Sequence, residues 1–348
     1  MSQLHVAAPA SKAVPLVQAT VDCYPEQVAE VGGKAVGLGR LLRAGQPVPA
    51  SFTVTAAAYR QFVAGGADEV PAAVIEAIAE GYAELCERRR ATIPVAVRSS
   101  ASVEDSDEAS CAGQFKTFLG ARGVAQVVGE IRACWLSAFD PHVDAYRAER
   151  SGAAGDAQVA VVVQELVDAR AAGVMFTQHP RSGDRSLVVI EASYGLGEAV
   201  VGGEVVPDLF EINKITRQVV KRSMGQKSHE YRLHTDGDQV ERREVDAARA
   251  SRWAIDDGHV AALAEMAAEL ESALGPGLDT EWALGSVAGS ADEASLFALQ
   301  VRPITTDPRA RLGPPGTTAA AAAARPPAAA SAVDLILGRL SGPGPALP

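Results

Sequence analysis

The segments DTEWALG, residues 279–285, and LFALQVRPIT, residues 296–305, are predicted to form two β-strands, the second of which begins with an apolar run of the length of a buried strand. Elsewhere, short runs rich in β-branched residues have the length of buried strands. These runs are residues 95–97, 159–163, 174–176, 187–190 and 296–299, and residues 209–220 alternate as a hairpin does. We therefore expect sheets in which most neighbouring strands are antiparallel.

Segments with helical spacing alternate with these strands. Residues 75–85 and 124–135 each have one apolar side, which predicts two amphipathic helices. A third helix around residues 41–42 should end near Gly45 and Pro47, because glycine suits a C-terminal cap and proline cannot continue the turn. The order lacks a regular βαβ rhythm, so the sequence predicts an α+β fold with mostly antiparallel sheets.

The composition is that of a folded protein and limits its partners. Of 348 residues, 47% are hydrophobic and 22% charged, which is enough apolar material for a core. A net charge of −11 argues against nucleic-acid binding, although a few basic side chains in a cleft can still bind a nucleotide. No apolar run reaches the ~18 residues of a membrane helix, no signal peptide is evident and the cysteines lack metal or disulfide spacing, so we expect a cytoplasmic protein.

The two C-terminal strands place polar side chains on one face each. Asp279 and Glu281 are two positions apart and so share a face, as do Gln300 and Arg302. If the strands pair, a carboxylate, an amide oxygen and a guanidinium group converge, which suits Mg²⁺ bound by oxygen atoms beside an arginine that contacts phosphate. A surface Glu–Arg pair across the strands explains the same residues without a ligand.

Two further segments have features of phosphate-binding sites. Gly32, Gly33 and Lys34 precede a helix, where exposed N–H groups favour anions, but the spacing is not that of a P-loop. A glycine turn with a solvated lysine is the alternative. The strand at residues 95–97 leads to Arg98, whose guanidinium group can bind two phosphate oxygens, and then to two serines that leave room for a ligand.

Two loops follow these segments. The acidic residues between 104 and 108 are more typical of a solvated loop than of metal ligands, and Gly113 and Thr117 come after them. Residues 192–203 contain four glycines after an expected strand, which indicates either a mobile loop near a ligand or a simple connector.

In this order the segments resemble the N-terminal ATP-binding domain of the pyruvate phosphate dikinase and phosphoenolpyruvate synthase family, which rifampin phosphotransferases share. The resemblance covers approximately residues 20–306 and rests on five collinear motifs. The motifs are VGGKAVGLGRLLRAGQPVPASFTVT, VAVRSSASVEDSDEASCAGQFKTFL, VVVQELVDARAAGVMFT, EASYGLGEAVVGGEVVPD, and DTEWALG followed by LFALQVRPIT. The resemblance implies an ATP-grasp fold, in which two α+β lobes bind ATP and Mg²⁺ between them.

The resemblance also implies roles for individual residues. Lys34 and Arg98 correspond to residues that contact phosphates. Gly113 and Thr117 correspond to the loop that covers the phosphates, and Gln164 to a residue near the adenine.

The C-terminal strands supply the remaining positions. Glu281 and Gln300 resemble the magnesium ligands, and Arg302 resembles the arginine that stabilises the transferring phosphoryl group. Together with Arg98, Arg302 is the expected catalytic residue.

The resemblance further implies a domain organisation. Residues 1–19 form an N-terminal arm, 20–200 the N-terminal lobe and 201–307 the C-terminal lobe with the magnesium-binding strands. Residues 308–348 form a tail whose Ala/Pro mixture cannot build a core.

The sequence departs from the family in two respects. The first motif reads GGKAVGLG where the family usually has GGKGANLG, which keeps the lysine but alters the loop. In addition, none of the six histidines lies in the Gly/Thr-rich setting of the family's phosphorylated histidine. The resemblance therefore implies an ATP-binding subunit that phosphorylates a histidine on a separate subunit, with AMP and phosphate formed, for transfer to a small-molecule acceptor. A self-contained small-molecule kinase and a regulatory module that binds ATP without catalysis are the alternatives.

Overall fold

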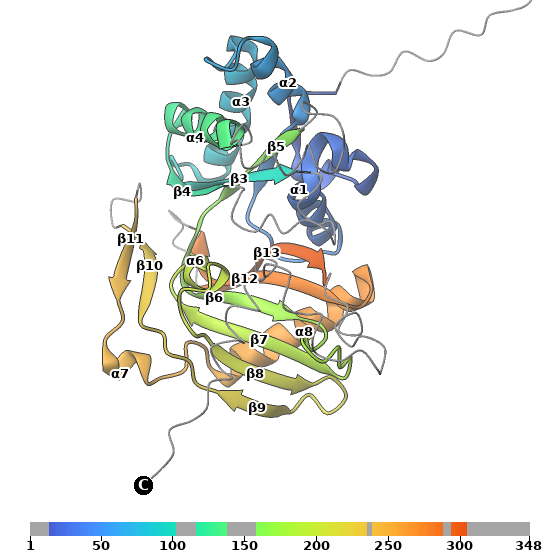
Figure 1. The fold of residues 1–348 in the computed structure, drawn as a ribbon, viewed down its shortest axis with the longest axis vertical. Coiled ribbons are helices and arrows are strands. Elements are labelled where there is room, and N and C mark those ends of the chain that lie inside the picture. Colours follow the sequence, from blue (N-terminus) through green and yellow to red (C-terminus); the bar gives the residue numbers. More distant parts are fainter. Residues whose placement is uncertain (1–13, 102–115, 138–157, 235–238, 288–293, 305–348) are drawn as a thin grey trace, which may run out of the picture.

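The computed structural model describes residues 14–101, 116–137, 158–234, 239–287 and 294–304. Two β-sheets in these residues belong to two lobes, a smaller lobe with three helices over its sheet and a larger lobe with one long helix over its sheet (Figure 1). All strand pairings in both sheets are antiparallel. The predicted α+β class with antiparallel sheets is therefore confirmed.

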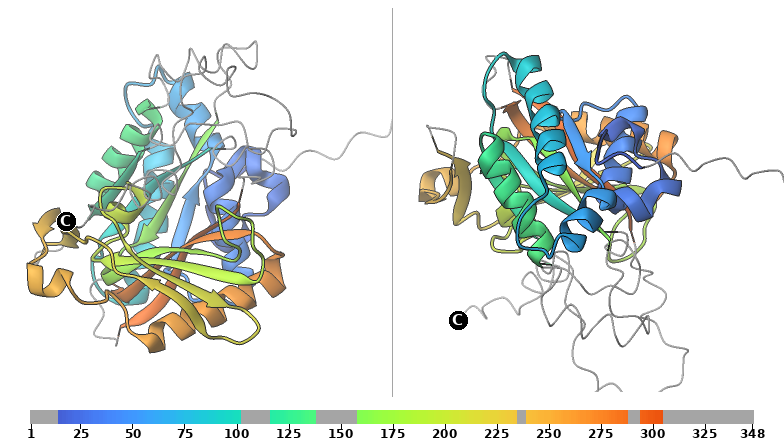
Figure 2. Two further views of the ribbon diagram at one scale, coloured as in Figure 1. Left: turned by 60° about the horizontal axis from the view of Figure 1, so that its bottom comes forward. Right: turned by 90° about the horizontal axis from the view of Figure 1, so that it is seen from above.

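The smaller lobe has a five-stranded sheet in the order β1-β2-β5-β3-β4. Its strands are β1 (Val17–Ala19), β2 (Ser51–Val54), β3 (Val95–Ala101), β4 (Thr117–Ala121) and β5 (Val159–Glu165). The helices are α2 (Ala56–Ala64), α3 (Ala72–Arg89) and α4 (Val124–Ser137), preceded by the 3₁₀ turns η1 (Thr20–Asp22) and η2 (Pro25–Gln27). Valines at alternate positions of β3 and β5 pack under these helices, which lie on the side of the sheet away from the larger lobe (Figure 2).

The larger lobe has a six-stranded sheet in the order β13-β12-β6-β7-β8-β9. Its strands are β6 (Val167–Phe176), β7 (Leu187–Tyr194), β8 (Asp208–Asn213), β9 (Val219–Ser223), β12 (Leu278–Val287) and β13 (Ser295–Pro303). Helix α8 (Asp257–Leu274) covers one face, because Val260, Leu263, Ala267 and Leu270 form an apolar stripe at helical spacing. The chain passes from the smaller to the larger sheet at Leu166, between β5 and β6. The lobe boundary at residue 200 remains a prediction.

Helix α1 (Val28–Arg43) packs against both lobes. Its buried residues Ala35, Leu38 and Leu41 share one apolar cluster with α8 and the larger sheet. A Cβ at Gly37 would lie 2.5 Å from the carbonyl oxygen of Val301, so glycine permits the close approach of α1 to β13. Its N-terminal end, in contrast, contacts β3 of the smaller lobe.

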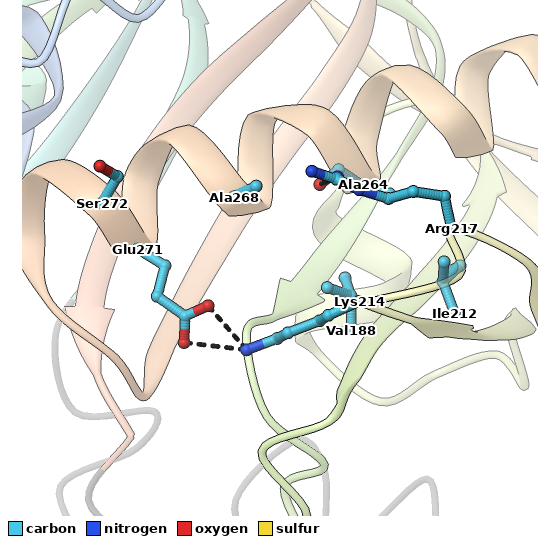
Figure 3. Close-up of a pocket in the computed structure, with 8 residues that line it drawn as sticks. All are labelled: Val188, Ile212, Lys214, Arg217, Ala264, Ala268, Glu271 and Ser272. Carbon is cyan, nitrogen blue, oxygen red and sulfur yellow. Dashed lines mark hydrogen bonds and ion pairs between the residues drawn. The ribbon is translucent and has the colours of Figure 1, made fainter.

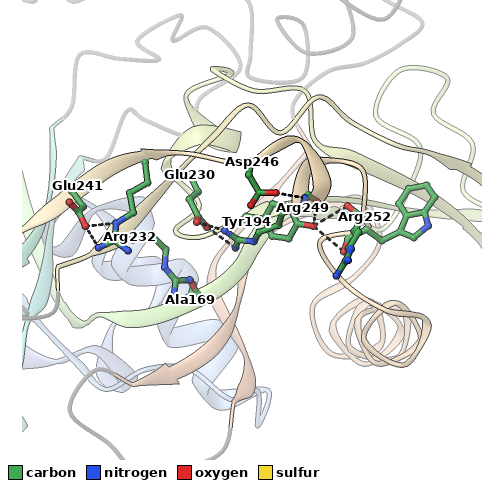
Figure 4. Close-up of polar contacts among 10 residues, drawn as sticks. Ala169, Tyr194, Glu230, Arg232, Glu241, Asp246, Arg249 and Arg252 are labelled. Atoms are coloured by element: carbon green, nitrogen blue, oxygen red, sulfur yellow. Dashed lines mark hydrogen bonds and ion pairs between the residues drawn. The ribbon is translucent and has the colours of Figure 1, made fainter.

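A two-stranded hairpin, β10 (His229–Leu233) and β11 (Val240–Glu244), lies beside the larger sheet with α7 (Ala247–Ala250) (Figure 1). Arg249 of α7 forms an ion pair with Glu230 of β10, and the Tyr194 hydroxyl of β7 donates to the Arg249 carbonyl oxygen at 2.8 Å (Figure 4). Arg232 donates to the carbonyl oxygen of Ala169 on β6 at 2.9 Å. These bonds attach the hairpin to the sheet.

A buried ion pair lies where the chain leaves β9 and enters this hairpin. Lys227 donates to Asp208 of β8 at 2.6 Å, and both side chains are 0% exposed. The backbone N–H groups of Gly225 and Ala254 also donate to Asp208, at 2.9 and 2.7 Å. The carboxylate is therefore fully hydrogen bonded, as a buried charge needs to be.

Most predicted elements are present. The runs predicted as strands lie in β3, β5, β6, β7 and β13, the hairpin at 209–220 is β8 and β9, and the three predicted helices are α1, α3 and α4. Gly113, the acidic residues at 104–108 and the tail at 308–348 lie outside the described residues. In the described part of the chain, none of the helices has both the length and the apolar character to cross a bilayer.

Candidate functional site

The site residues lie on the faces of the two sheets that are turned toward each other. In the smaller lobe, Val161 and Val163 pack under helices, so the alternate residues Val162 and Gln164 point to the opposite face. In the larger lobe, Trp282 packs on the α8 side, so its neighbour Glu281 points away from α8. The two faces meet around Arg98.

Arg98, the fourth residue of β3, joins the lobes. Its Nη2 atom donates to Glu281 Oε2 at 2.7 Å and to Gln300 Oε1 at 2.8 Å. Its Nη1 atom donates to the carbonyl oxygen of Leu299 at 3.2 Å. Arg98 is only 8% exposed, and a nearly buried ion pair with good geometry is a strong constraint on the relative position of the two sheets.

The two C-terminal strands pair as the site requires. Glu281 lies directly opposite Gln300, and Asp279 lies opposite Arg302. Arg302 Nε donates to Asp279 Oδ2 at 2.9 Å. The carboxylate, the amide oxygen and the guanidinium group that the alternation placed on one face are therefore neighbours.

The glycine segment at the start of α1 is held against the end of β3. Ser100 Oγ donates to the carbonyl oxygen of Val31 at 2.9 Å and accepts from the Ala35 N–H at 3.2 Å. Lys34 Nζ donates to the carbonyl oxygen of Ser99 at 2.9 Å. Gly32 has a φ of +76°, and a Cβ there would lie 2.1 Å from the Ser100 carbonyl oxygen. The segment therefore needs glycine at this position, and the contacts bring Lys34 to the strand that bears Arg98.

Two more predicted residues lie on the same face of the smaller sheet. Thr117, the first residue of β4, is exposed and pairs with Arg98. Gln164 on β5 pairs with Ala96, two residues before Arg98, and is 2% exposed. Its Nε2 atom has no hydrogen-bond partner among the residues that the structure describes, although buried amides are normally satisfied. An unsatisfied donor on this face is a position where a ligand could accept a hydrogen bond.

Electrostatics distinguish the two carboxylates nearest to Arg98. Burial acts to raise the pKa of Glu281, but positive charge, first from Arg98 and then from Arg302 and Lys34, outweighs it and holds that pKa below its usual value. On α6 (Glu198–Val201), desolvation by the surrounding protein raises the pKa of Glu198, and the carboxylates of Glu204 and Glu281 add to this. The pKa of Glu281 is therefore lowered and that of Glu198 raised, and Glu198 is an acidic neighbour that the sequence did not single out.

A second acidic residue on this face, Glu191 of β7, also escaped prediction. Glu191 is in register with Val174 of β6, which is in register with Glu281, so the two carboxylates share a face. It is 1% exposed, and within the described part of the chain its Oε2 atom has no hydrogen-bond partner. Burial, with a smaller effect of Asp279, raises the pKa of Glu191 to about 7. Because it lies within an apolar run, only a structure reveals its surroundings.

The glycine-rich segment that follows β7 forms a turn and α6. Gly195 has a φ of +71°, and the Leu196 N–H donates to the carbonyl oxygen of Tyr231 on β10 at 2.8 Å. Tyr231 also donates through its hydroxyl to Glu204, at 2.9 Å. The segment therefore connects the hairpin to the region around Glu198.

A separate cavity of about 260 Å³ lies on the α8 side of the larger sheet (Figure 3). Lys214 contacts both carboxylate oxygens of Glu271 there, at 2.8 and 2.7 Å. Val188 and Ile212 also line it and lie on the face opposite Glu281. The cavity is therefore apart from the cluster around Arg98, and its lysine already has an anionic partner.

The donor set around Arg98 suits magnesium. Glu281 Oε2 and Gln300 Oε1 point at one nitrogen, so two oxygen atoms from adjacent strands converge where a positive group already lies. Hard oxygen donors of this kind are the ligands that Mg²⁺ prefers, usually with phosphate oxygens and water completing the shell. Among the described residues, no group of three His, Cys, Asp or Glu could hold a metal by itself.

Comparisons with known proteins identify the family of this chain. Residues 66–319 match the model of the pyruvate phosphate dikinase AMP/ATP-binding domain. The chain is 37% identical over 336 aligned residues to a probable phosphoenolpyruvate synthase of Methanothermobacter thermautotrophicus, covering 87% of this chain and 48% of the relative.

Two further relatives match a similar share of the chain. Identity is 33% to the phosphoenolpyruvate synthase of Aeropyrum pernix (79% of this chain, 40% of the relative) and 35% to the prodigiosin synthesizing transferase PigC of Serratia marcescens (79% and 32%). The chain thus spans less than half the length of each of these curated relatives.

Proposed function

The chain belongs to the family of the pyruvate phosphate dikinase AMP/ATP-binding domain, and on this basis we propose that it binds Mg²⁺ and ATP between its lobes as the nucleotide-binding subunit of a phosphoenolpyruvate synthase-like phosphotransferase. The observation that supports this best is the convergence of Arg98 from one sheet with Glu281 and Gln300 from the other. Two α+β lobes whose sheets face each other around such a cluster are the arrangement expected of an ATP-grasp fold.

Each residue of the cluster has a chemical task in this proposal. Lys34 and Arg98 bind phosphate oxygens, and Arg302 stabilises the charge that develops on the transferring phosphoryl group. Gln164 offers its unsatisfied amide to the adenine, and Thr117 lies beside the phosphates. Mg²⁺ held by Glu281 and Gln300 would supply further charge neutralisation. Because phosphoryl transfer depends on positioning and charge, these residues suffice without a nucleophile from this chain.

We propose that the phosphate acceptor is a histidine on a separate, cytoplasmic partner subunit, which then passes the phosphate to a small molecule while AMP and phosphate are released. The described histidines have other contacts: His229 lies 3.0 Å from Glu204, and His259 lies 2.5 Å from Asp256. The relatives' additional length is a place where such an acceptor could lie in those proteins.

Nucleotide binding is tested by titrating ATP at several Mg²⁺ concentrations into the wild type, Glu281→Ala and Glu84→Ala. Glu281→Ala should weaken Mg²⁺-dependent binding by ~10-fold or more, since a charged ligand is lost. Glu84→Ala is the matched control, because its side chain is 67% exposed on α3. Equal binding by all three proteins over the whole Mg²⁺ range would rule out the ligand assignment.

The acceptor is tested by following labelled ATP with and without a candidate histidine-bearing partner. The proposal expects AMP, and a phosphorylated histidine, only when the partner is present. ADP formed by the chain alone with a small acceptor would indicate a self-contained kinase. ATP binding without any turnover in either mixture would favour a regulatory module.

A further inference from the structure

Arg98 occupies the oxygen atoms that the proposed function assigns to the metal. One nitrogen, Nη2, donates to both Glu281 Oε2 and Gln300 Oε1, at 2.7 and 2.8 Å. Those two atoms belong to residues that lie directly opposite each other on the paired strands β12 and β13. A cation bound by both oxygens would lie where Nη2 lies, so the two positive groups exclude each other.

The surrounding charge makes a second cation more unfavourable. Arg302 and Lys34 add positive charge near Glu281, beyond that of Arg98. One acidic group of β12, Asp279, is hydrogen bonded to Arg302. A free divalent cation would therefore have to enter a region with three basic side chains and to displace one of them.

Displacement also has a consequence for Arg98 itself. Its side chain is only 10% exposed, and its other hydrogen bond to a described residue is to a neutral carbonyl oxygen, that of Leu299. Without Glu281 and Gln300, the nearly buried guanidinium charge would lose its ion pair and two of these three hydrogen bonds, which is a costly state. Phosphate oxygens are strong bidentate partners for arginine and would restore the lost bonds.

We propose, building on the proposed function, that Arg98 is a specificity-determining residue that makes the site select a divalent cation bound to a nucleotide over the free cation. The hydrogen bonds of Arg98 to Glu281 and Gln300 keep these oxygens from a free cation. A nucleotide's phosphates draw the guanidinium group away from these oxygens and release them for the cation. Metal and nucleotide binding are therefore coupled, and each raises the affinity for the other by the same factor.

The test measures Mn²⁺ binding directly, by calorimetry and by the loss of the free-ion electron spin resonance signal. Mn²⁺ is titrated into the wild type and Arg98→Met, each with and without a non-hydrolysable ATP analogue. The wild type should bind free Mn²⁺ weakly and bind it ~10- to 100-fold more tightly with the analogue present. Arg98→Met should bind free Mn²⁺ ~10-fold more tightly than the wild type. The ratio of its Mn²⁺ affinities with and without the analogue should fall toward one.

Two controls separate occupation of the ligands from a general change in charge. Arg302→Met removes a nearby positive charge but leaves the Arg98 guanidinium group hydrogen bonded to Gln300. Its gain in free Mn²⁺ affinity should therefore be clearly smaller than that of Arg98→Met. Adding Glu281→Gln to Arg98→Met should abolish the gain, which shows that Mn²⁺ binds at Glu281. Should Arg98→Met fail to fold, Arg98→Gln serves in its place, since it is shorter and neutral.

The outcomes are distinguishable from a failure of the proposed function. If the wild type binds neither the analogue nor Mn²⁺ with it, the proposed function is wrong and this inference falls with it. If the wild type binds both, but Arg98→Met and Arg98→Gln bind free Mn²⁺ no more tightly, only the inference is overturned. A gain in free Mn²⁺ affinity in Arg302→Met equal to that in Arg98→Met would likewise overturn the inference.

Discussion

Replacing Gly32 with alanine should separate the role of the α1 loop in ligand binding from its role in stability. Gly32 has φ +76° and ψ 167°, a region of backbone conformation essentially confined to glycine. Its Cβ would lie 2.1 Å from the carbonyl oxygen of Ser100 and 2.3 Å from the Ser100 Oγ. A backbone oxygen cannot turn aside as a side chain can, so the loop has to move away from β3.

Gly45, at the other end of α1, provides a matched control. Its φ is +74°, almost that of Gly32, but a Cβ there would meet nothing within 4 Å. Gly45→Ala should therefore cost only the backbone preference, roughly 1–2 kcal/mol of unfolding free energy. Gly32→Ala adds the loss of the two Ser100 hydrogen bonds, at about 1 kcal/mol each, for a total of roughly 3–4 kcal/mol.

The assay combines urea unfolding with ATP titration at saturating Mg²⁺. Because the displaced loop carries Lys34 away from the strand that bears Arg98, Gly32→Ala should lose at least ~10-fold in ATP affinity. Gly45→Ala should bind ATP as the wild type does. Equal ATP affinity in the two variants, both folded, would show that the contact with Ser100 does not position Lys34.

Three further perturbations test other parts of the structure. Arg302→Ala should preserve the fold but lower phosphotransfer by ~10²-fold or more, and a wild-type rate in a steady-state assay would refute its role. Lys227→Met leaves Asp208 buried and unpaired, so urea unfolding should show a loss of about 3–5 kcal/mol; the control Lys221→Met, whose side chain is 56% exposed, should lose no more than about 1 kcal/mol. The pKa of Glu191 is raised from an ordinary value of 4.5 to about 7, so the folded state binds this proton more tightly and unfolding free energy should fall as pH rises between those values. The fall should be roughly 3 kcal/mol at most, and a pH profile of unchanged shape in Glu191→Gln would contradict this assignment.

Periodicity was enough to predict most elements near the site. The two-residue period of a strand placed Glu281 on the same face of its strand as Asp279, and Gln300 on the same face as Arg302. The buried run at residues 95–97 placed Arg98 directly after predicted strand residues. Helix α8 was not predicted, although Val260, Leu263 and Ala267 keep helical spacing. The short strand β1 and the hairpin β10–β11 have too weak an alternation to be recognised without their partners.

Contacts between distant residues could not be predicted from local pattern. Arg98 and Glu281 are 183 positions apart, and their ion pair depends on how the two sheets are turned relative to each other. The strand order of the larger sheet places β12 next to β6, which no periodicity indicates. The roles of Lys34, Thr117 and Gln164 in ATP binding remain predictions that the structure makes testable.

The position of α1 determines how this protein could be divided into fragments. A polypeptide ending at Glu165 would contain every strand of the smaller sheet, but it would expose to water the Leu38 and Leu41 side chains that normally lie under α8. The remainder, beginning at Leu166, would lack the helix that fills its own apolar interior. Neither half should be soluble and folded when expressed alone, whereas the two expressed together should reassociate, with α1 as the element that unites them.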